Sequence, residues 1–100
     1  MPDFILFMHN DANESKTTDN AGAWRLYIEK LQAKGMFQGG SSIGSGVCKN
    51  VSGSKTNITS HLVGYIRIQA DSTRDVEELL VGNPVFEAGG TVEIRELPTE

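Results

Sequence analysis

The sequence predicts an α+β domain in which two helices cover one face of an antiparallel sheet. Three observations carry this prediction: a strongly apolar strand at 3–9, a second apolar strand at 61–70, and two segments with helical periodicity. The expected order is β-α-β-β-α-β, the ferredoxin-like arrangement. A chain of 100 residues has the usual size of one domain, so we expect residues 1–100 to form a single unit.

The first part of the chain predicts a strand followed by a helix. Residues 4–8 are all apolar and do not alternate with polar residues, which indicates a strand buried on both faces. The helix, at 21–34, has an apolar stripe with i, i+3, i+4 and i+7 spacing, made of Trp24, Tyr27, Ile28 and Leu31. Gly35 stands where a left-handed residue would end this helix.

The middle of the chain is the least regular part. Residues 36–43 predict a weak strand, and residues 44–59 are rich in Gly, Ser, Thr and Asn. In the second segment we expect a hairpin or a mobile excursion, with a short strand near 47–51. The strand at 61–70 places Leu62, Gly64, Ile66 and Ile68 on one face and His61, Val63, Tyr65, Arg67 and Gln69 on the other.

The last third of the chain predicts a second helix and a final strand. Ser72 and Asp75 form a capping-box-like pair at the start of the helix. Gly82 is expected to end the helix and Pro84 to prevent its continuation. The strand at 91–97 alternates, with Val92 and Ile94 on one face and Thr91, Glu93 and Arg95 on the other.

The two-sided apolar first strand means that both faces of the sheet need a cover. Two short helices can cover only one face, and an exposed apolar sheet face is a site of association. A second copy of the same chain is the simplest cover for the other face. We therefore expect a homodimer.

The C-terminal run from Asn83 to Leu97, together with the segments 4–8, 31–40 and 64–68, resembles the YCII-related (DGPF-type) family of dimeric α+β barrel proteins. The resemblance implies a dimer in which two sheets face each other. Two features depart from the family. Its Asp-Gly-Pro-Phe run is absent at 52–58, and the His and Asp proposed as a catalytic pair in relatives are matched here by Trp24 and Asn83. Neither of these side chains is a general acid or base.

Six residues are candidates for a ligand pocket: His9, Trp24, His61, Tyr65, Arg67 and Arg95. His9 ends the first strand beside a loop, and histidine is the residue type best suited to acid–base work at physiological pH, although a partly exposed strand-end histidine is the simpler interpretation. Trp24 belongs first of all to the core stripe of its helix. It could also form the wall of a cavity that suits a planar ligand.

The remaining candidates share one face of the sheet. His61, Tyr65 and Arg67, with Glu93 and Arg95, could line a polar pocket that binds a small acid. The alternative, which we favour, is an interface in which these charges pair across the dimer, because Arg and Tyr are common at interfaces.

Composition argues against several classes of protein. The net charge is -4 and the basic residues are scattered, which is unlike a nucleic-acid-binding surface. Cys48 is the single cysteine, so no internal disulfide is possible, and residues 4–8 are too short an apolar run for a signal segment or a membrane span. We expect a cytoplasmic protein without membrane contact.

The sequence gives no motif for a cofactor or a metal. His9, His61 and Cys48 lack the spacing of zinc ligands, and Cys48 has no base near it in the sequence to activate it. We therefore expect neither group. The function favoured is a small-molecule-binding or regulatory module, and the alternative is an enzyme that acts on a small organic acid or a cyclic metabolite.

Overall fold

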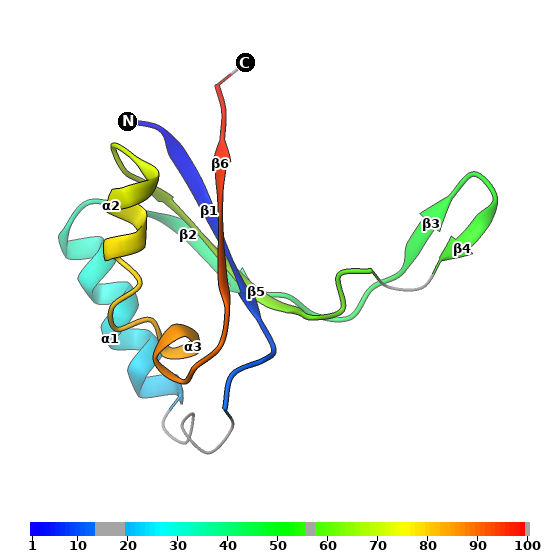
Figure 1. The fold of residues 1–100 in the computed structure, drawn as a ribbon, viewed down its shortest axis with the longest axis horizontal. Coiled ribbons are helices and arrows are strands. Elements are labelled where there is room, and N and C mark those ends of the chain that lie inside the picture. The colour runs from blue at the N-terminus through cyan, green and yellow to red at the C-terminus, as the bar shows by residue number, and fades with distance from the viewer. Residues whose placement is uncertain (14–19, 56–57, 100) are drawn as a thin grey trace.

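The computed structural model describes residues 1–13, 20–55 and 58–99 (Figure 1). Its elements in chain order are β1 (Asp3–His9), α1 (Asn20–Ala33), β2 (Phe37–Ser42), β3 (Cys48–Asn50), β4 (Gly53–Lys55), β5 (Leu62–Gln69), α2 (Thr73–Glu78), α3 (Pro84–Glu87) and β6 (Val92–Leu97). In this part of the chain no helix has the length and apolar character needed to cross a membrane.

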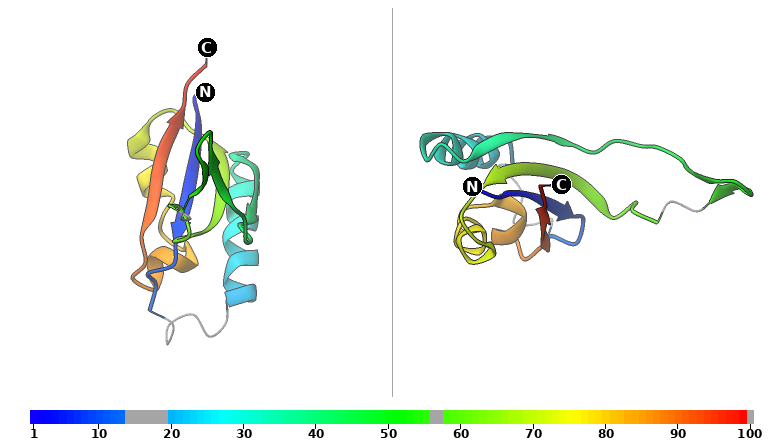
Figure 2. Two further views of the ribbon diagram at one scale, coloured as in Figure 1. Left: turned by 90° about the vertical axis from the view of Figure 1, so that its right-hand side faces the viewer. Right: turned by 90° about the horizontal axis from the view of Figure 1, so that it is seen from above.

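The main sheet is antiparallel, with the strand order β2-β5-β1-β6. The two most apolar strands, β1 and β5, are therefore the central ones, where burial is greatest. Figures 1 and 2 show the helices gathered on one side of this sheet. The predicted ferredoxin-like β-α-β-β-α-β fold is confirmed.

The core lies between the helices and one face of the sheet. Phe4, Leu6 and Met8 of β1 are buried on this face. Leu6 lies opposite Ile66 of β5 and opposite Ile94 of β6. Leu31, from the predicted stripe of α1, is fully buried against them. The helical and strand periodicities read from the sequence thus meet in one core.

The other face of the sheet has no helix on it. Ile5 and Phe7 of β1 point to this side and are only half-buried. The sequence predicted that β1 is buried on both faces, but within this chain only the face towards the helices is buried. The register places Arg67 and Arg95 on either side of Ile5, and Tyr65 and Glu93 on either side of Phe7. We call this surface the open face, defined by Ile5, Phe7, His9, Tyr65, Arg67, Glu93 and Arg95. The left panel of Figure 2 looks onto it.

The region after β5 begins with the predicted helix, but this helix is shorter than expected and a further short helix follows it. Ser72 caps α2 as predicted, since its hydroxyl accepts from the backbone N–H of Asp75 at 3.2 Å. However, α2 ends at Glu78, and Pro84 begins a further helix, α3, that the sequence analysis did not predict. Proline suits the first turn of a helix because its N–H would have no partner there and its φ is already helical.

The segment between β2 and β5 contains a hairpin, one of the two alternatives that the sequence predicted. Its strands β3 and β4 pair antiparallel around a turn at 51–52. Residues 43–55 and 58–60, which we call the arm, include this hairpin and lie away from the sheet and the helices (Figures 1 and 2). The arm stands out on the side of the open face.

Candidate functional site

A cavity of about 500 Å³ lies between α1 and the sheet. Trp24 and Ile28 of α1 line one wall, and Phe37 and Ser42 come from the edge strand β2. The other lining residues are Met8, Gly40, Ser41, Val63, Gly64, Tyr65, Ile66 and Val85. This volume lies within the range of 300–1,000 Å³ that is typical of small-molecule pockets.

The cavity is mainly apolar and holds little acid–base chemistry. Among the described residues that line it, Tyr65 is the only one with an ionisable side chain. Ser41 and Ser42 of β2 also border the cavity, and the hydroxyl of Ser41 donates to the carbonyl oxygen of Ser42 at 2.9 Å. Trp24 packs edge-on against Tyr27, with 6.0 Å between the ring centroids, which helps to fix the indole at the wall. The cavity can therefore bind an apolar or planar molecule, but it offers no general base of ordinary strength.

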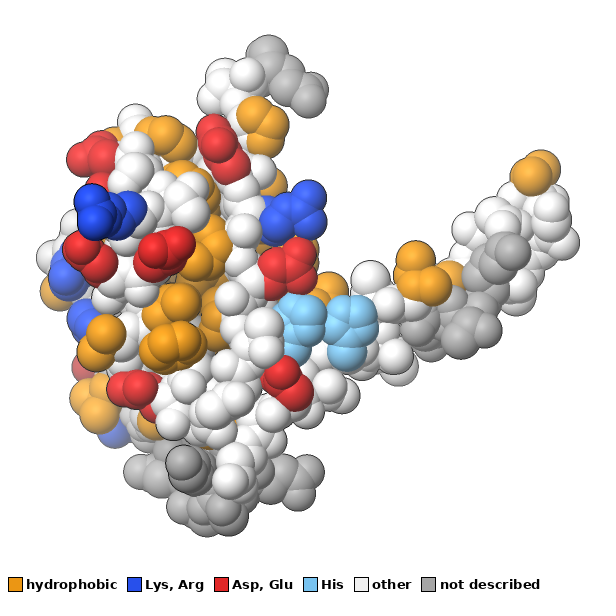
Figure 3. Space-filling view, viewed as in Figure 1, with side chains coloured by type: hydrophobic (Ala, Val, Ile, Leu, Met, Phe, Trp, Pro, Cys, Tyr) orange, Lys and Arg blue, Asp and Glu red, His pale blue; other side chains and the backbone are white. Residues whose placement is uncertain are grey.

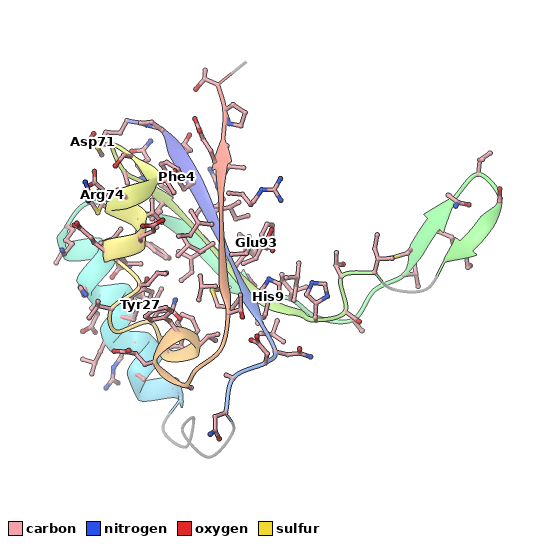
Figure 4. All side chains as sticks on the ribbon, in the orientation of Figure 1. Phe4, His9, Tyr27, Asp71, Arg74 and Glu93 are labelled. Carbon is pink, nitrogen blue, oxygen red and sulfur yellow. The ribbon has the colours of Figure 1, made fainter. Side chains whose placement is uncertain are left out.

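A second group of candidate side chains lies on the open face. The Nε2 of His9 and the Oε1 of Glu93 are 3.0 Å apart, and the side chain of His9 is only 19% exposed. Arg95 donates from Nη1 to Oε2 of the same carboxylate at 3.2 Å. Figure 4 shows His9 and Glu93 pointing away from the helices. The carboxylate thus holds an imidazole in place, an arrangement common to general-base sites.

His61 completes this group from the base of the arm. Its ring lies 4.8 Å from that of His9, centroid to centroid, and the two histidines appear side by side in Figure 3. The backbone supports the contact, because the N–H of Asn10 donates to the carbonyl oxygen of His61 at 2.8 Å. A register shift between Met8 and His9 accompanies this arrangement.

Hydrogen bonds lower the pKa values of two carboxyl groups near this point. The pKa of Glu93 lies below its ordinary value, chiefly because of its hydrogen bond to His9 and next because of that to Arg95. The pKa of Asp11 is also lowered, because the hydroxyl and the backbone N–H of Thr91 donate to it at 2.6 and 2.8 Å. Both carboxylates are therefore stabilised in the charged form.

We expect His9→Ala to raise the pKa of Glu93 towards its ordinary value, and Arg95→Ala to raise it less. The pKa rises in both variants because His9 and Arg95 each form a hydrogen bond that favours the charged carboxylate of Glu93, and each variant removes one of these bonds. The contribution of Glu93 to stability is therefore present above its ordinary pKa and is lost as pH falls through the lowered value. Titration of the Glu93 carboxyl carbon by NMR measures both shifts. Arg67→Ala is the control on the same face, and an unchanged pKa in His9→Ala would contradict the expectation.

The structure divides the six predicted pocket residues between two places. Trp24 lines the cavity, as one interpretation of the sequence anticipated, whereas His9, His61, Arg67 and Arg95 lie on or beside the open face. Tyr65 belongs to a strand that borders both. Asn83, which the predicted resemblance to the YCII-related family aligns with an Asp, is buried and caps α3, accepting from the N–H groups of Val85 and Phe86.

Some contributors to these sites were not singled out from the sequence. Phe37, Ser42 and Val85 line the cavity, and Asp11 holds the start of β6 through Thr91. Their sequence neighbourhoods carry no motif that marks them. Within the described ranges, no cluster of three or more His, Cys, Asp or Glu side chains has the arrangement of a metal site.

Comparison with known proteins shows a likeness in fold. No protein-family model matches the chain, and no curated protein matches it in sequence. A solved structure of 5-chloro-2-hydroxyhydroquinone dehydrochlorinase (TftG) from Burkholderia phenoliruptrix, in complex with 2,5-dihydroxybenzoquinone, does match. It shares 18% identity with a TM-score of 0.64, over 98% of this chain and 95% of that one. The likeness supports the α+β fold, while membership of the YCII-related family stays a prediction.

Proposed function

We propose that this protein is a small-molecule-binding module that takes a flat, cyclic ligand in the cavity beside Trp24. One observation carries the proposal: a cavity of about 500 Å³ that is bordered by Trp24 and by Ser41 and Ser42 of β2, with no strong acid or base among its described lining residues. An indole face favours planar rings through stacking, and a serine hydroxyl can hydrogen-bond to a ring oxygen. The solved structure with the similar fold holds 2,5-dihydroxybenzoquinone, a ligand of this kind.

The single tryptophan makes the proposal directly testable, because its indole lines the cavity. We expect 2,5-dihydroxybenzoquinone or hydroquinone, but not succinate, to shift the indole N–H signal of Trp24 saturably in ¹H–¹⁵N spectra. Trp24→Leu should weaken binding about tenfold, which corresponds to about 1.4 kcal/mol of lost ring contact. Leu26→Ala, on the exposed side of the same helix, should bind as the wild type does. Shifts confined to the open face would contradict the proposal.

A second candidate function rests on the open face. The His9–Glu93 pair, with Arg95 beside it and Arg67 across Ile5, has the parts needed to hold a small acid and to move a proton. This favours an enzyme that acts on a small organic acid or a cyclic metabolite. Chromatography of the compounds used in the binding experiment distinguishes the two functions. Conversion that His9→Ala abolishes would establish the enzyme, and absence of conversion would favour the binding module.

The open face also supports a homodimer. Its centre, Ile5 and Phe7, is apolar and half-buried, while charged residues of both signs surround it. This is the composition of a protein–protein interface, with an apolar centre and a polar rim. Packing two open faces together would bury β1 on both sides, as its sequence predicts. Light scattering should then give twice the chain mass of 10.9 kDa.

A further inference from the structure

The cavity beside Trp24 is lined by two glycines from adjacent strands, and the packing of the chain requires only one of them. A Cβ at Gly40 would lie 2.6 Å from the backbone oxygen of Tyr65, so β2 and β5 can approach each other only without a side chain there. A Cβ at Gly64 would lie 3.4 Å from the backbone oxygen of Ser41 and 3.5 Å from Cε of Met8, which are ordinary contact distances. The backbone of Gly64 is not in the left-handed region either. Alanine would therefore fit at position 64.

A glycine at position 64 is unfavourable for the strand that contains it. Gly64 is buried in β5, one of the two central strands of the sheet. Glycine in a strand interior loses more conformational entropy on folding than other residues and has no side chain to pack. Such a glycine is typical of places where another backbone or a ligand approaches closely. Since no close backbone contact requires Gly64 and the residue lines the cavity, a ligand is the better explanation.

The register of the sheet places Ser42 beside Gly64. The two residues lie directly opposite each other in the pairing of β2 with β5. Opposite residues in an antiparallel pair share one face of the sheet, and Gly64 shares the face towards the helices with buried Ile66. Ser41, in contrast, lies opposite Tyr65 of the open face, and its hydroxyl donates to the carbonyl oxygen of Ser42. Ser42 is therefore the serine on the cavity side of β2.

We propose that a single ring lies on the bare backbone at Gly64, under the indole of Trp24, and that the hydroxyl of Ser42 hydrogen-bonds to an oxygen atom of this ring. The proposal deepens the proposed function and rests on it. Trp24 borders the cavity from α1 and Gly64 borders it from β5. A flat ring between them contacts the indole on one face and the peptide backbone on the other. A methyl group at position 64 would occupy part of this space.

The cavity lining also selects the class of ring. None of the described residues that border the cavity is basic. An ionised carboxylate would lose its hydration there without gaining a charged partner, whereas a hydroxyl or carbonyl oxygen needs only a hydrogen bond. The ligand class is therefore a ring that carries a hydroxyl or carbonyl oxygen rather than a carboxylate.

Gly64→Ala distinguishes a ligand-binding glycine from a structural one. The dissociation constant of hydroquinone, measured from the indole N–H signal of Trp24, should rise about tenfold because the added methyl group occupies the space of the ring. The midpoint of thermal unfolding should stay at or above that of the wild type, because alanine fits at this position and lowers the entropy of the unfolded chain. A lower midpoint would show that the fold itself needs the glycine, and it would overturn the proposal.

Ser42→Ala tests the hydrogen bond. It should raise the dissociation constant of hydroquinone about fivefold, the effect of one lost hydrogen bond. It should leave unchanged the constant of p-xylene, in which methyl groups replace both hydroxyls. Ser41→Ala is the matched control on the same strand and should bind both compounds as the wild type does. In the wild type, 4-hydroxybenzoate should bind about tenfold more weakly than hydroquinone.

The outcomes separate this inference from the proposed function. Weaker hydroquinone binding in Gly64→Ala and Ser42→Ala, but not in Ser41→Ala, supports the proposal. Hydroquinone binding that neither variant weakens, or that Ser41→Ala weakens equally, overturns the placement of the ring and leaves the cavity as a binding site. Equal affinity for 4-hydroxybenzoate overturns the proposed ligand class. A wild-type protein in which no ring compound shifts the Trp24 signal overturns both the inference and the proposed function.

Discussion

Leu31→Ala should lower the free energy of unfolding by about 2–5 kcal/mol. Leu31 is 0% exposed and packs from α1 into the core above the sheet. Its removal costs the transfer free energy of the lost methyl groups and also leaves a cavity, because the rigid sheet on the other side cannot collapse into the space. Urea unfolding followed by far-ultraviolet circular dichroism measures the change.

The matched control for this prediction lies on the same helix. Leu26 is 65% exposed, so Leu26→Ala should change the free energy of unfolding by less than about 0.5 kcal/mol. Equal losses in the two variants would show that α1 does not pack on the sheet through the face that contains Leu31.

Gly40→Ala should destabilise the protein by about 1–3 kcal/mol through crowding. A Cβ at Gly40 would lie 2.6 Å from the backbone oxygen of Tyr65 and 3.2 Å from the Cα of Ile66. Backbone atoms of a paired strand cannot rotate away as a side chain can, so β2 and β5 must move apart. Since Gly40 also lines the cavity, binding at Trp24 should weaken in the same variant.

Gly44 provides the control for crowding. A Cβ there would meet nothing within 4 Å, and its backbone is not in the left-handed region. Gly44→Ala should be neutral, or stabilising by about 0.4–1 kcal/mol through the reduced entropy of the unfolded chain. Thermal unfolding of both variants makes the comparison. A Gly40→Ala variant as stable as Gly44→Ala would contradict the close approach of β2 to β5.

The sequence determined much of the fold because its signals are local. The unbroken apolar run at 4–8 and the alternation from Leu62 to Gln69 predicted the two central strands. The stripe that includes Trp24 and Leu31 predicted the buried face of α1. In contrast, α3 was not predicted, because Pro84 was interpreted as a residue that prevents a helix. In the structure Asn83 caps α3 and Pro84 occupies its first turn, where proline is favourable.

The tertiary structure decided how the candidate residues are grouped. Trp24 and His9 were both possible pocket residues in the sequence, yet the sheet separates the cavity from the open face. The partner of His9 is Glu93, which lies 84 positions away in the chain. The hydrophobic pattern of the sequence cannot predict this pair, because His9 and Glu93 come together only when β1 and β6 pair in the folded sheet.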